Sequence, residues 1–476
     1  MNQRGKRIKA LVFGAGRFYA NRKEALWERA EVTGFLDNAQ ALHGREIDGR
    51  RVFFPWEAAG LEWEYIVLMS VKTDEMYRQL TGLGIPEERI LVYQDLLQGE
   101  LQVFGKREPE GEGRKRVLLV TTALDYTGAP LAALYAARAL KQAGYETVLA
   151  AEGYDENLLR EALGWGLTVY ICPAIPHLGE EELRWMGEFD LFLVNTFPMM
   201  EAACRLASLG PVLWWIHEPY EIYGPVMEKW ENRRASQGLA DLPMRVCAVS
   251  EIPQRRFNSY FPGVIRELLP YGIPDEAVRE GERKAEGPMV FALVGFVTQR
   301  KAQECFVRAA HALEEAYGKR AVFLLIGHMG EDGYSQEVQR LCGGHPQIKI
   351  CGTYTREQMA GAYPSIDAVV CPSIEDPLPI VMTEAMMWGK ALIVSEETGT
   401  RRYIKDQWNG LVCRAGDPAS LYEKMEWVME HREELGPMGR RARKTYEENF
   451  SMEAFSKRLG EEMEKTEAAW ERGRKG

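Results

Sequence analysis

Residues 372–389 read PSIEDPLPIVMTEAMMWG. An apolar run, Ala368–Val370, comes just before this stretch, and the proline-rich turn DPLP leads into residues that predict a helix from about Ile380. A strand, a turn and a helix in this order form the repeating unit of α/β proteins with a parallel sheet. Ligands of such sheets bind beyond the carboxyl ends of the strands, so we expect this turn to border a binding site.

The same alternation of short apolar runs and helix-like stretches continues outward along the chain in three series. Residues 106–114, KREPEGEGR, are charged, rich in Gly and Pro, and predict a linker after the first series. The sequence YGIP at 271–274 precedes a polar stretch, and we interpret it as a hinge before the third series. We therefore expect domains at 1–105, 115–274 and 275–455, followed by a charged helix at 456–476.

The composition restricts the class of protein. The 476 residues carry a formal net charge of −11, which argues against a nucleic-acid partner because phosphate binding needs a basic surface. The eight cysteines form no CxxC pair, which argues against a zinc or redox site and fits a reducing compartment. No signal-peptide pattern is visible, and no apolar run reaches the roughly 20 residues of a membrane span. We expect a cytoplasmic protein and leave peripheral attachment to the inner face of the membrane open.

The stretch at 372–389 carries groups suited to a sugar nucleotide. The N-terminus of the expected helix offers free N–H groups and the positive end of a dipole, which suit a diphosphate. Glu384 lies one turn inside that helix, close enough to accept hydrogen bonds from ribose hydroxyls. Glu375 or Asp376, just before the helix, could hold sugar hydroxyls. The other residues of the turn that we expect to line the site are Pro377, Leu378, Pro379 and Ile380.

This segment resembles the donor-site signature of family 4 glycosyltransferases. The signature has two acidic residues eight positions apart, the second followed by Ala, a short apolar stretch and Gly, and Asp376 and Glu384 with EAMMWG match it. The family usually has Glu at the first position. This chain has Asp376 there, with Glu375 beside it, so the shorter carboxylate changes the geometry of the expected sugar contact.

A second part of the resemblance lies in GFVTQRK at 295–301. In the family a Gly turn is followed by a Lys that contacts the diphosphate, and Gly295 and Lys301 have that spacing. Many members also carry Arg directly after the Gly. This chain has Phe296 at that position, and Arg300 is the residue that would compensate.

The resemblance covers roughly residues 115–455 and implies an α/β protein of the GT-B fold, in which two Rossmann-like domains face a cleft. In the family a Gly-rich turn of the N-terminal half faces the donor phosphates, and the sequence TGAP, with Gly128 and Ala129, resembles it. His217, beside Glu218, follows an expected strand and is a candidate for holding the sugar or assisting the reacting centre.

The reaction that the resemblance implies is sugar transfer with retention of configuration at the anomeric carbon. The donor would be a UDP or GDP sugar, and the acceptor a glycan or a lipid-linked precursor of a cell-surface polysaccharide or glycoconjugate. The sequence has no Asp-x-Asp pair, so we expect no metal and no cofactor. Lys301 and Arg300, with helix N-termini, would stabilise the leaving diphosphate electrostatically. Nothing in the sequence indicates an oligomeric state.

The first series of elements resembles the small Rossmann-like domain found beside sugar-modifying enzymes. GAGRFYA, with Gly14 and Gly16, follows a strand and matches half of a dinucleotide fingerprint, while the third Gly is missing. Asp37 ends the next strand, where a ribose-binding carboxylate would stand. Nucleotide binding and a purely structural or docking role both remain open for this domain.

Three alternatives to a transferase remain. An inactive sugar-nucleotide binder with a scaffold or regulatory role is favoured by Phe296 and Asp376, the two departures from the family pattern. Another GT-B enzyme, such as an epimerase or a phosphorylase, is the second, although no pyridoxal-binding Lys motif is found. The third is an NAD-dependent oxidoreductase centred on the first domain.

Overall fold

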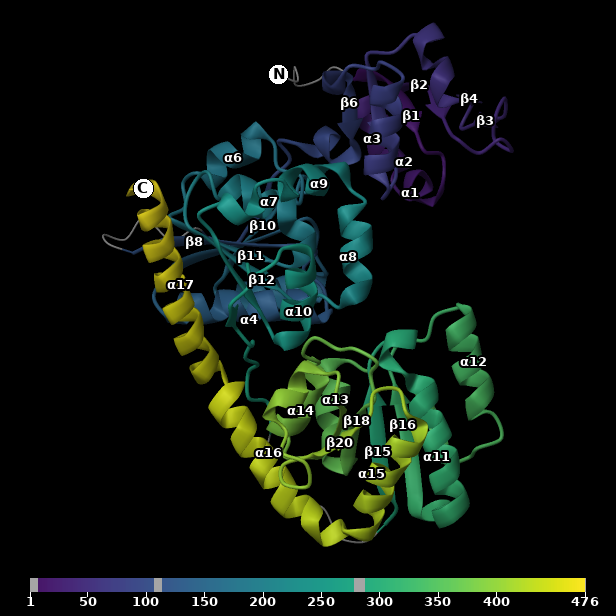
Figure 1. The fold of residues 1–476 in the computed structure, drawn as a ribbon, viewed down its shortest axis with the longest axis vertical. Coiled ribbons are helices and arrows are strands. Elements are labelled where there is room, and N and C mark those ends of the chain that lie inside the picture. The colour runs from purple at the N-terminus through teal and green to yellow at the C-terminus, as the bar shows by residue number, and fades with distance from the viewer. Residues whose placement is uncertain (1–6, 107–113, 278–286, 476) are drawn as a thin grey trace.

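The computed structural model describes residues 7–106, 114–277 and 287–475. Three sheets follow one another along the chain, and we call the parts built on them the first, second and third domains (Figure 1). Residues 107–113 of the expected linker, and most of the polar stretch after the hinge, lie outside the described residues. Among the described residues, no helix combines the length and the apolar character needed to cross a membrane.

The first domain has a 6-stranded sheet in the order β3-β4-β2-β1-β5-β6, parallel except for the β3–β4 pair. Its strands are β1 (Ile8–Phe13), β2 (Ala30–Leu36), β3 (Glu46–Ile47), β4 (Arg50–Phe53), β5 (Tyr65–Leu68) and β6 (Ile90–Val92). Its α-helices are α1 (Arg17–Ala20), α2 (Lys23–Arg29) and α3 (Thr73–Gly82), and its 3₁₀ turns are η1 (Pro55–Gly60), η2 (Glu87–Arg89) and η3 (Tyr93–Leu97). Buried apolar side chains cover both faces of the sheet, as expected for parallel strands between helices.

The second domain has an 8-stranded sheet in the order β14-β13-β12-β11-β8-β9-β10-β7. Its strands are β7 (Gln102–Phe104), β8 (Arg116–Thr121), β9 (Glu146–Ala151), β10 (Thr168–Ile171), β11 (Leu191–Asn195), β12 (Val212–Ile216), β13 (Arg245–Ala248) and β14 (Glu267–Leu268). Its helices and 3₁₀ turns are α4 (Gly128–Gln142), α5 (Glu156–Gly164), α6 (Glu180–Met186), η4 (Phe197–Met199), α7 (Met200–Leu206), α8 (Tyr220–Met227), α9 (Trp230–Ser236), η5 (Leu239–Asp241) and α10 (Glu251–Tyr260). The edge strand β7 pairs antiparallel with β10, so this strand belongs to the second sheet although it lies within the range 1–105 expected for the first domain.

The third domain has a 6-stranded parallel sheet in the order β17-β16-β15-β18-β19-β20. Its strands are β15 (Met289–Val294), β16 (Ala321–Ile326), β17 (Ile348–Gly352), β18 (Ala368–Cys371), β19 (Ala391–Ser395) and β20 (Leu411–Cys413). Its helices and 3₁₀ turns are η6 (Gln299–Lys301), α11 (Gln303–Tyr317), η7 (Gly318–Arg320), α12 (Gly333–Cys342), α13 (Arg356–Ala362), η8 (Tyr363–Ser365), α14 (Ile380–Met387), η9 (Gly399–Tyr403), α15 (Pro418–Glu430), η10 (Arg432–Glu434) and α16 (Leu435–Asn449). The three expected α/β units are therefore confirmed as three mostly parallel sheets flanked by helices.

Helix α17 (Met452–Lys475) leaves the third domain and runs back along the second one, at the left edge of Figure 1. Its buried residues Phe455, Leu459 and Met463 join one apolar cluster that also includes Trp215 of β12 and Met386 of α14. Arg245 of β13 donates to Glu462 at 2.8 Å. The second and third domains therefore share one continuous apolar core, and α17 forms part of it.

The chain passes between the second and third domains twice, and the two crossings lie together. Ile273 of the YGIP segment donates its N–H to Phe450 at 2.9 Å, and Tyr446 donates its hydroxyl to the carbonyl of Ile273 at 3.0 Å. A Cβ at Gly272 would lie 2.5 Å from Cβ of Phe455, so glycine is required for this close approach. The expected hinge is thus braced by the junction of α16 and α17.

Parallel sheets of this kind bind ligands where the strand order reverses. In the second sheet that point lies between β8 and β11, and in the third between β15 and β18. The turns that follow β8, β15 and β18 contain the glycine-rich and acidic motifs of the sequence. The topology therefore brings these motifs to the ends of the two sheets where a ligand is expected.

Candidate functional site

Contacts between the second and third domains bring the predicted segments together. Tyr271 donates its hydroxyl to the carbonyl of Leu378 at 2.8 Å, and the hydroxyl of Ser250 binds the carbonyl of Pro377. A Cβ placed on Gly128, the first residue of α4, would lie 3.9 Å from Cδ1 of Ile380 at the start of α14. The TGAP turn of the second domain and the DPLP turn of the third therefore face each other directly.

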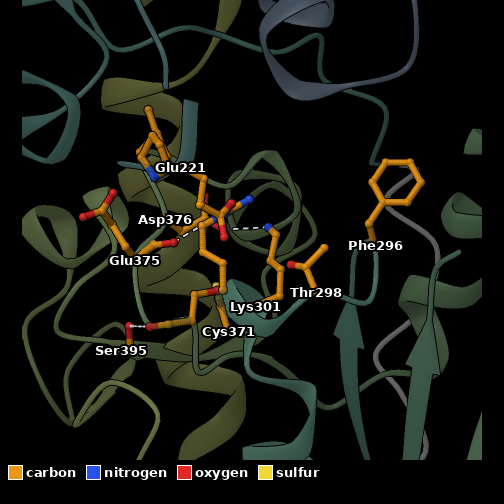
Figure 2. A network of polar contacts seen from close by, with 12 residues as sticks. Glu221, Phe296, Thr298, Lys301, Cys371, Glu375, Asp376 and Ser395 are labelled. Carbon is orange, nitrogen blue, oxygen red and sulfur yellow. Dashed lines mark hydrogen bonds and ion pairs between the residues drawn. The ribbon is translucent and has the colours of Figure 1, made fainter. Parts of the chain in front are cut away.

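The centre of the site is a group of two cations and one carboxylate. Lys301 Nζ lies 2.6 Å from Asp376 Oδ2 (Figure 2). Arg300 Nη1 lies 3.3 Å from the same oxygen. Arg300 Nη1 also donates to the carbonyl of Glu375 at 2.9 Å. Burial alone would raise the pKa of Asp376, but the charges of Lys301 and Arg300 outweigh it and lower that pKa. Lys301, Arg300 and Asp376 together therefore carry one positive charge, which Glu221, 3.3 Å from Arg300 Nε, offsets.

Backbone geometry places the lysine. Gly295 has φ +147°, and the side chain of Lys301 lies 3.6 Å from the position of a Cβ on that glycine. A Cβ on Gly327, after β16, would lie 2.0 Å from the carbonyl oxygen of Gly295. Ala302, which begins α11, has φ +54°, a left-handed value unusual for a residue with a Cβ. This tight turn directs Lys301 toward Asp376 and leaves Phe296 pointing away from the group, 53% exposed.

Glu375 is bound by the second domain. Its carboxylate accepts the N–H of Tyr220 at 2.7 Å and pairs with Arg256 at 3.0 Å. Arg300 is shared in the same way, since its Nε lies 3.3 Å from Glu221 of α8. These contacts close the two domains upon each other at the edge of the charged group.

Glu384 lies in the second turn of α14, and its partner comes from the third domain. Tyr363 donates its hydroxyl to Glu384 Oε2 at 2.8 Å. Burial raises the pKa of Glu384 to about 7, although the hydrogen bond from Tyr363 and the charge of Arg356 act in the opposite direction. A buried carboxylic acid that is partly protonated near neutral pH can both donate and accept hydrogen bonds.

His217 and Glu218 follow β12 and are both buried. Burial lowers the pKa of His217 to about 3, so its imidazole is neutral at physiological pH. Its Nε2 is buried and has no hydrogen-bond partner among the described residues, which marks a group available to a ligand. Burial raises the pKa of Glu218 to about 7, and its carboxylate accepts the backbone N–H of His217 at 2.9 Å. Glu218 thus braces the strand end that carries His217.

The glycine of the EAMMWG motif has a structural explanation. Gly389 follows α14 with φ +62°, the left-handed conformation that ends many helices. A Cβ on Gly439 of α16 would lie 1.9 Å from the carbonyl oxygen of Gly389. The motif therefore ends in glycine because the helix must stop there and because α16 crosses within contact distance.

Several residues of the site have no signal in the sequence. Arg356 of α13 pairs with Glu161 of α5 at 2.7 Å and also with Glu276 after the hinge. Glu221 and Arg256 make the contacts to Arg300 and Glu375 given above. Each of these residues is charged, and local sequence cannot distinguish a charged residue that forms such a pair from a solvated one.

In the first domain, the glycine turn is hydrogen-bonded by Asp37 of the same domain. Asp37 accepts the N–H of Ala15 at 3.1 Å and that of Ala39 at 2.8 Å. Gly14 has φ +101°, and a Cβ there would lie 2.8 Å from the carbonyl oxygen of Met69, while Gly16 faces open space. The three residues predicted to bind a nucleotide therefore lie together, with the Asp37 carboxylate stabilising the turn itself. Within the described parts of the chain, no group of three or more His, Cys, Asp or Glu side chains could hold a metal ion.

Protein-family comparisons match three segments of the chain. Residues 6–91 match the family described as C2185-like, N-terminal, residues 113–234 match Glycosyl-transferase family 4, and residues 274–445 match Glycosyl transferases group 1. The first domain and the two halves that meet at the site are thus matched separately.

Curated relatives match over a limited stretch. An uncharacterized glycosyltransferase of Methanocaldococcus jannaschii is 26% identical over 183 residues, 38% of this chain and 46% of that protein. The sulfoquinovosyl transferase SQD2 of Arabidopsis thaliana is 25% identical over 173 residues, 36% of this chain and 32% of that protein. The match spans less than half the length of either relative.

Solved structures match over most of the chain. The Anabaena HepE protein, in complex with UDP and glucose, superposes with a TM-score of 0.62 at 15% identity, over 74% of this chain and 100% of that one. Sucrose-phosphate synthase of Thermosynechococcus elongatus gives 0.58 at 17% identity, over 75% and 100%. At such identities the likeness establishes the fold.

Proposed function

The chain carries both glycosyltransferase domains of the family 4 type in a GT-B fold, and on this premise we propose that it moves a sugar from a nucleotide-diphosphate sugar to an acceptor. The observation that carries the proposal is the group formed by Lys301, Arg300 and Asp376 at the end of the third sheet. Its two cations lie where the domains meet, close to the start of α14.

The leaving group of this reaction is a nucleoside diphosphate, whose negative charge grows as the sugar bond breaks. Fixed cations in a site shielded from water stabilise such charge strongly. Lys301 and Arg300 supply this positive charge, and the free N–H groups at the start of α14 add to the stabilisation of the diphosphate. In this proposal the step needs only Lys301 and Arg300 as cations, with Arg300 shared between the diphosphate and Glu221.

The donor is held by carboxyl groups on both sides of its diphosphate. In this proposal Asp376 accepts hydrogen bonds from sugar hydroxyls, and Glu384 binds the ribose. Glu375 acts in closing the domains, because its carboxylate is committed to Tyr220 and Arg256. The lining of the diphosphate site comes from Gly128 and Ala129 on one side and the turn 377–380 on the other.

His217 contacts the reacting centre as a neutral hydrogen-bonding group. Burial holds the pKa of His217 well below its usual range, which favours the neutral imidazole. Its unpartnered Nε2 is the atom that would bind a hydroxyl of the transferred sugar or of the acceptor. The acceptor hydroxyl then attacks the anomeric carbon on the face from which the diphosphate leaves, the bond from that carbon to the phosphate oxygen breaks, and the hydroxyl proton passes to the departing phosphate oxygen. This gives retention without a covalent intermediate on the protein.

A ligand screen tests the proposal first. The thermal midpoint is measured with UDP, GDP, ADP and their sugars, and UDP sugars come first because HepE was solved with UDP. A ligand at 100 times its Kd adds about 2.7 kcal/mol of stability. We expect one nucleotide sugar to stabilise the wild type and to lose most of that effect in Lys301→Ala and Glu384→Ala. If none stabilises the wild type, the proposal is wrong.

Turnover separates a transferase from a sugar-nucleotide binder without activity. Exposed Phe296, where the family pattern has Arg, is the feature that favours the binder. Release of the nucleoside diphosphate from the stabilising donor, with a glycan or lipid-linked acceptor present, supports transfer. Nuclear magnetic resonance of the product's anomeric proton then shows whether configuration is retained. Tight donor binding with no release over hours supports the binder instead.

A further inference from the structure

Helix α8 of the second domain touches both of the other domains (Figure 1). At its N-terminal end, Tyr220 donates to Glu375 at 2.7 Å and Glu221 pairs with Arg300 at 3.3 Å, both in the third domain. Just past its C-terminal end, the carbonyl of Glu228 accepts the N–H of Asp74 of the first domain at 2.9 Å. One short element therefore joins the donor site to the first domain.

This helix has little stability of its own. It has eight residues and contains Gly224 followed by Pro225, which removes the hydrogen bond to the carbonyl of Glu221. Isolated helices of this length are unstable in water. Tyr223, which stacks on Phe197 at 4.3 Å, and Val226 are buried in the core of the second domain, and the residues at the two ends of the helix add contacts with the neighbouring domains.

The first domain fixes the C-terminal end of α8 through its contacts with the start of α9. The ring of Tyr77 in α3 stacks on Trp230 with centroids 4.6 Å apart and planes within 7°. The hydroxyl of Thr73 accepts the N–H of Trp230 at 3.2 Å and donates to Glu231 at 3.1 Å. Thr73, Asp74 and Glu231 are all buried, so this contact excludes water and fixes the turn between α8 and α9.

The N-terminal end of α8 places the negative charge of Glu221 at the proposed phosphate site. Glu221 Oε2 lies 3.3 Å from Nε of Arg300, one of the two cations that would meet the diphosphate. Arg300 Nε is buried and makes no hydrogen bond within the described residues. Its contact with Glu221 is therefore an ion pair that does not have hydrogen-bond geometry. A diphosphate that binds Arg300 must displace this carboxylate or bind beside a like charge.

We propose that the first domain acts on donor binding through α8, by holding Glu221 against Arg300. Tyr77 and Thr73 are then positioning residues, and Glu221 is a competitor of the donor diphosphate for Arg300. This inference rests on the proposed donor site. It assigns the first domain a role in setting the affinity of that site, apart from any nucleotide that the first domain itself binds.

Isothermal titration of the full-length protein with UDP, GDP and ADP tests the inference. An ion pair in which the Glu221 side chain is 42% exposed shifts binding by at most about fivefold. We expect Glu221→Gln to lower the Kd of the bound diphosphate about threefold to fivefold. Tyr77→Ala should lower it about twofold to threefold, since it loosens the C-terminal end of α8. Tyr77→Phe keeps the stacked ring and should match the wild type.

The double variant Glu221→Gln/Tyr77→Ala gives the readout that a merely structural role would not produce. Because Glu221→Gln removes the carboxylate that α8 holds against Arg300, adding Tyr77→Ala to it should not change the Kd further. Should Tyr77→Ala unfold the first domain, Thr73→Val, which removes two hydrogen bonds and keeps the shape, replaces it.

An unchanged or higher Kd in both Glu221→Gln and Tyr77→Ala overturns the inference, and so does a full effect of Tyr77→Ala in the Glu221→Gln background. If either of these results is obtained while a diphosphate still binds to the wild type, the role of the first domain is wrong and the proposed donor site is retained. Absence of any binding to the wild type, and to Glu221→Gln, overturns the donor site itself.

Discussion

Single residues of the site differ sharply in how their charge is compensated. Asp376 has two cations within 3.3 Å, while His217 is neutral and has an imidazole nitrogen without a partner. Glu384 is buried beside a single hydroxyl donor. These differences fix which residues attract an anion and which respond to pH.

Lys301→Ala should lower kcat/KM for sugar transfer about 10²-fold to 10³-fold, because loss of one electrostatic donor to a leaving group has effects of that order. Arg300 still neutralises Asp376, so the protein should fold. The steady-state rate of diphosphate release measures the effect. Lys444→Ala is the matched control, since that lysine is 73% exposed on α16. Full activity of Lys301→Ala would remove this residue from the mechanism.

Glu384 should make the folded protein less stable as the pH rises. Its pKa is about 7 in the folded state against a reference value of 4.5, so between these values the folded chain binds more protons than the unfolded one. Stability therefore falls as the pH rises from about 4.5 through 7, by up to about 3 kcal/mol.

Glu384→Gln stays neutral at every pH and should escape this loss. Its thermal midpoint should exceed that of the wild type at pH 8 and equal it at pH 4.5. Parallel midpoint curves for the two proteins would contradict the buried, protonated state of Glu384.

The sequence was informative about site residues that belong to a spaced motif. Lys301, Asp376 and Gly295 lie together as their spacing predicts, because a tight turn and a helix start leave them little freedom. The pairing of Glu375 with Arg256, and of Arg300 with Glu221, could not be predicted. Those pairs join residues far apart in the chain, and only the closure of two domains brings them within 4 Å.

At the level of elements, glycine contacts decide how the helices of the third domain pack. Helices α14 and α16 cross where Gly439 meets the backbone of Gly389. The alternation of strands and helices was predictable, since apolar runs of parallel strands are easy to recognise, and expected strands such as Val212–Ile216 match the structure. The crossing of α16 over Gly389 could not be predicted, because it depends on close contact between two backbones, and such contact produces no pattern of side chains in the sequence.

Gly439→Ala should push α16 away from α14 and destabilise the third domain. Overpacking of this kind costs about 1–3 kcal/mol, and the new methyl would lie 1.9 Å from a carbonyl oxygen that cannot move freely. Thermal unfolding measures the loss. Gly436→Ala, in the same helix, is the control because its nearest neighbour is the end of the Arg440 side chain at 3.6 Å. Equal midpoints for both variants would show that the crossing tolerates a side chain.

At the scale of the whole molecule, the second domain depends on residues from the far end of the chain. Helix α17 packs Phe455 on Trp215, with ring centroids 5.7 Å apart, and Lys115 pairs with Glu467. The sequence predicted a charged helix at 456–476, and the structure has α17 at Met452–Lys475. The charged composition of α17 hid its buried face, because Phe455, Leu459 and Met463 are the buried apolar residues of a mostly polar helix.

Phe455→Ala should therefore destabilise the second and third domains together, by about 3–5 kcal/mol for a fully buried ring. Calorimetry would show one shifted transition for both domains, since they share the core that the ring completes. Trp470→Ala, nearer the end of the same helix, should have a smaller effect because Trp470 lies outside that core. Two separate transitions, with only the third domain affected, would contradict a shared core.

The return of α17 has a consequence for synthesis on the ribosome. The strands of the second domain are complete once Leu268 has been made, yet the helix that covers Trp215 follows roughly 200 residues later. At about 5–20 residues per second, the interval is roughly 10 to 40 s. Throughout that time the nascent second domain exposes an apolar face that its own sequence cannot cover. Chaperones that bind such faces should stay on the nascent chain until α17 has been made, and slow codons between residue 268 and α17 should lengthen their stay.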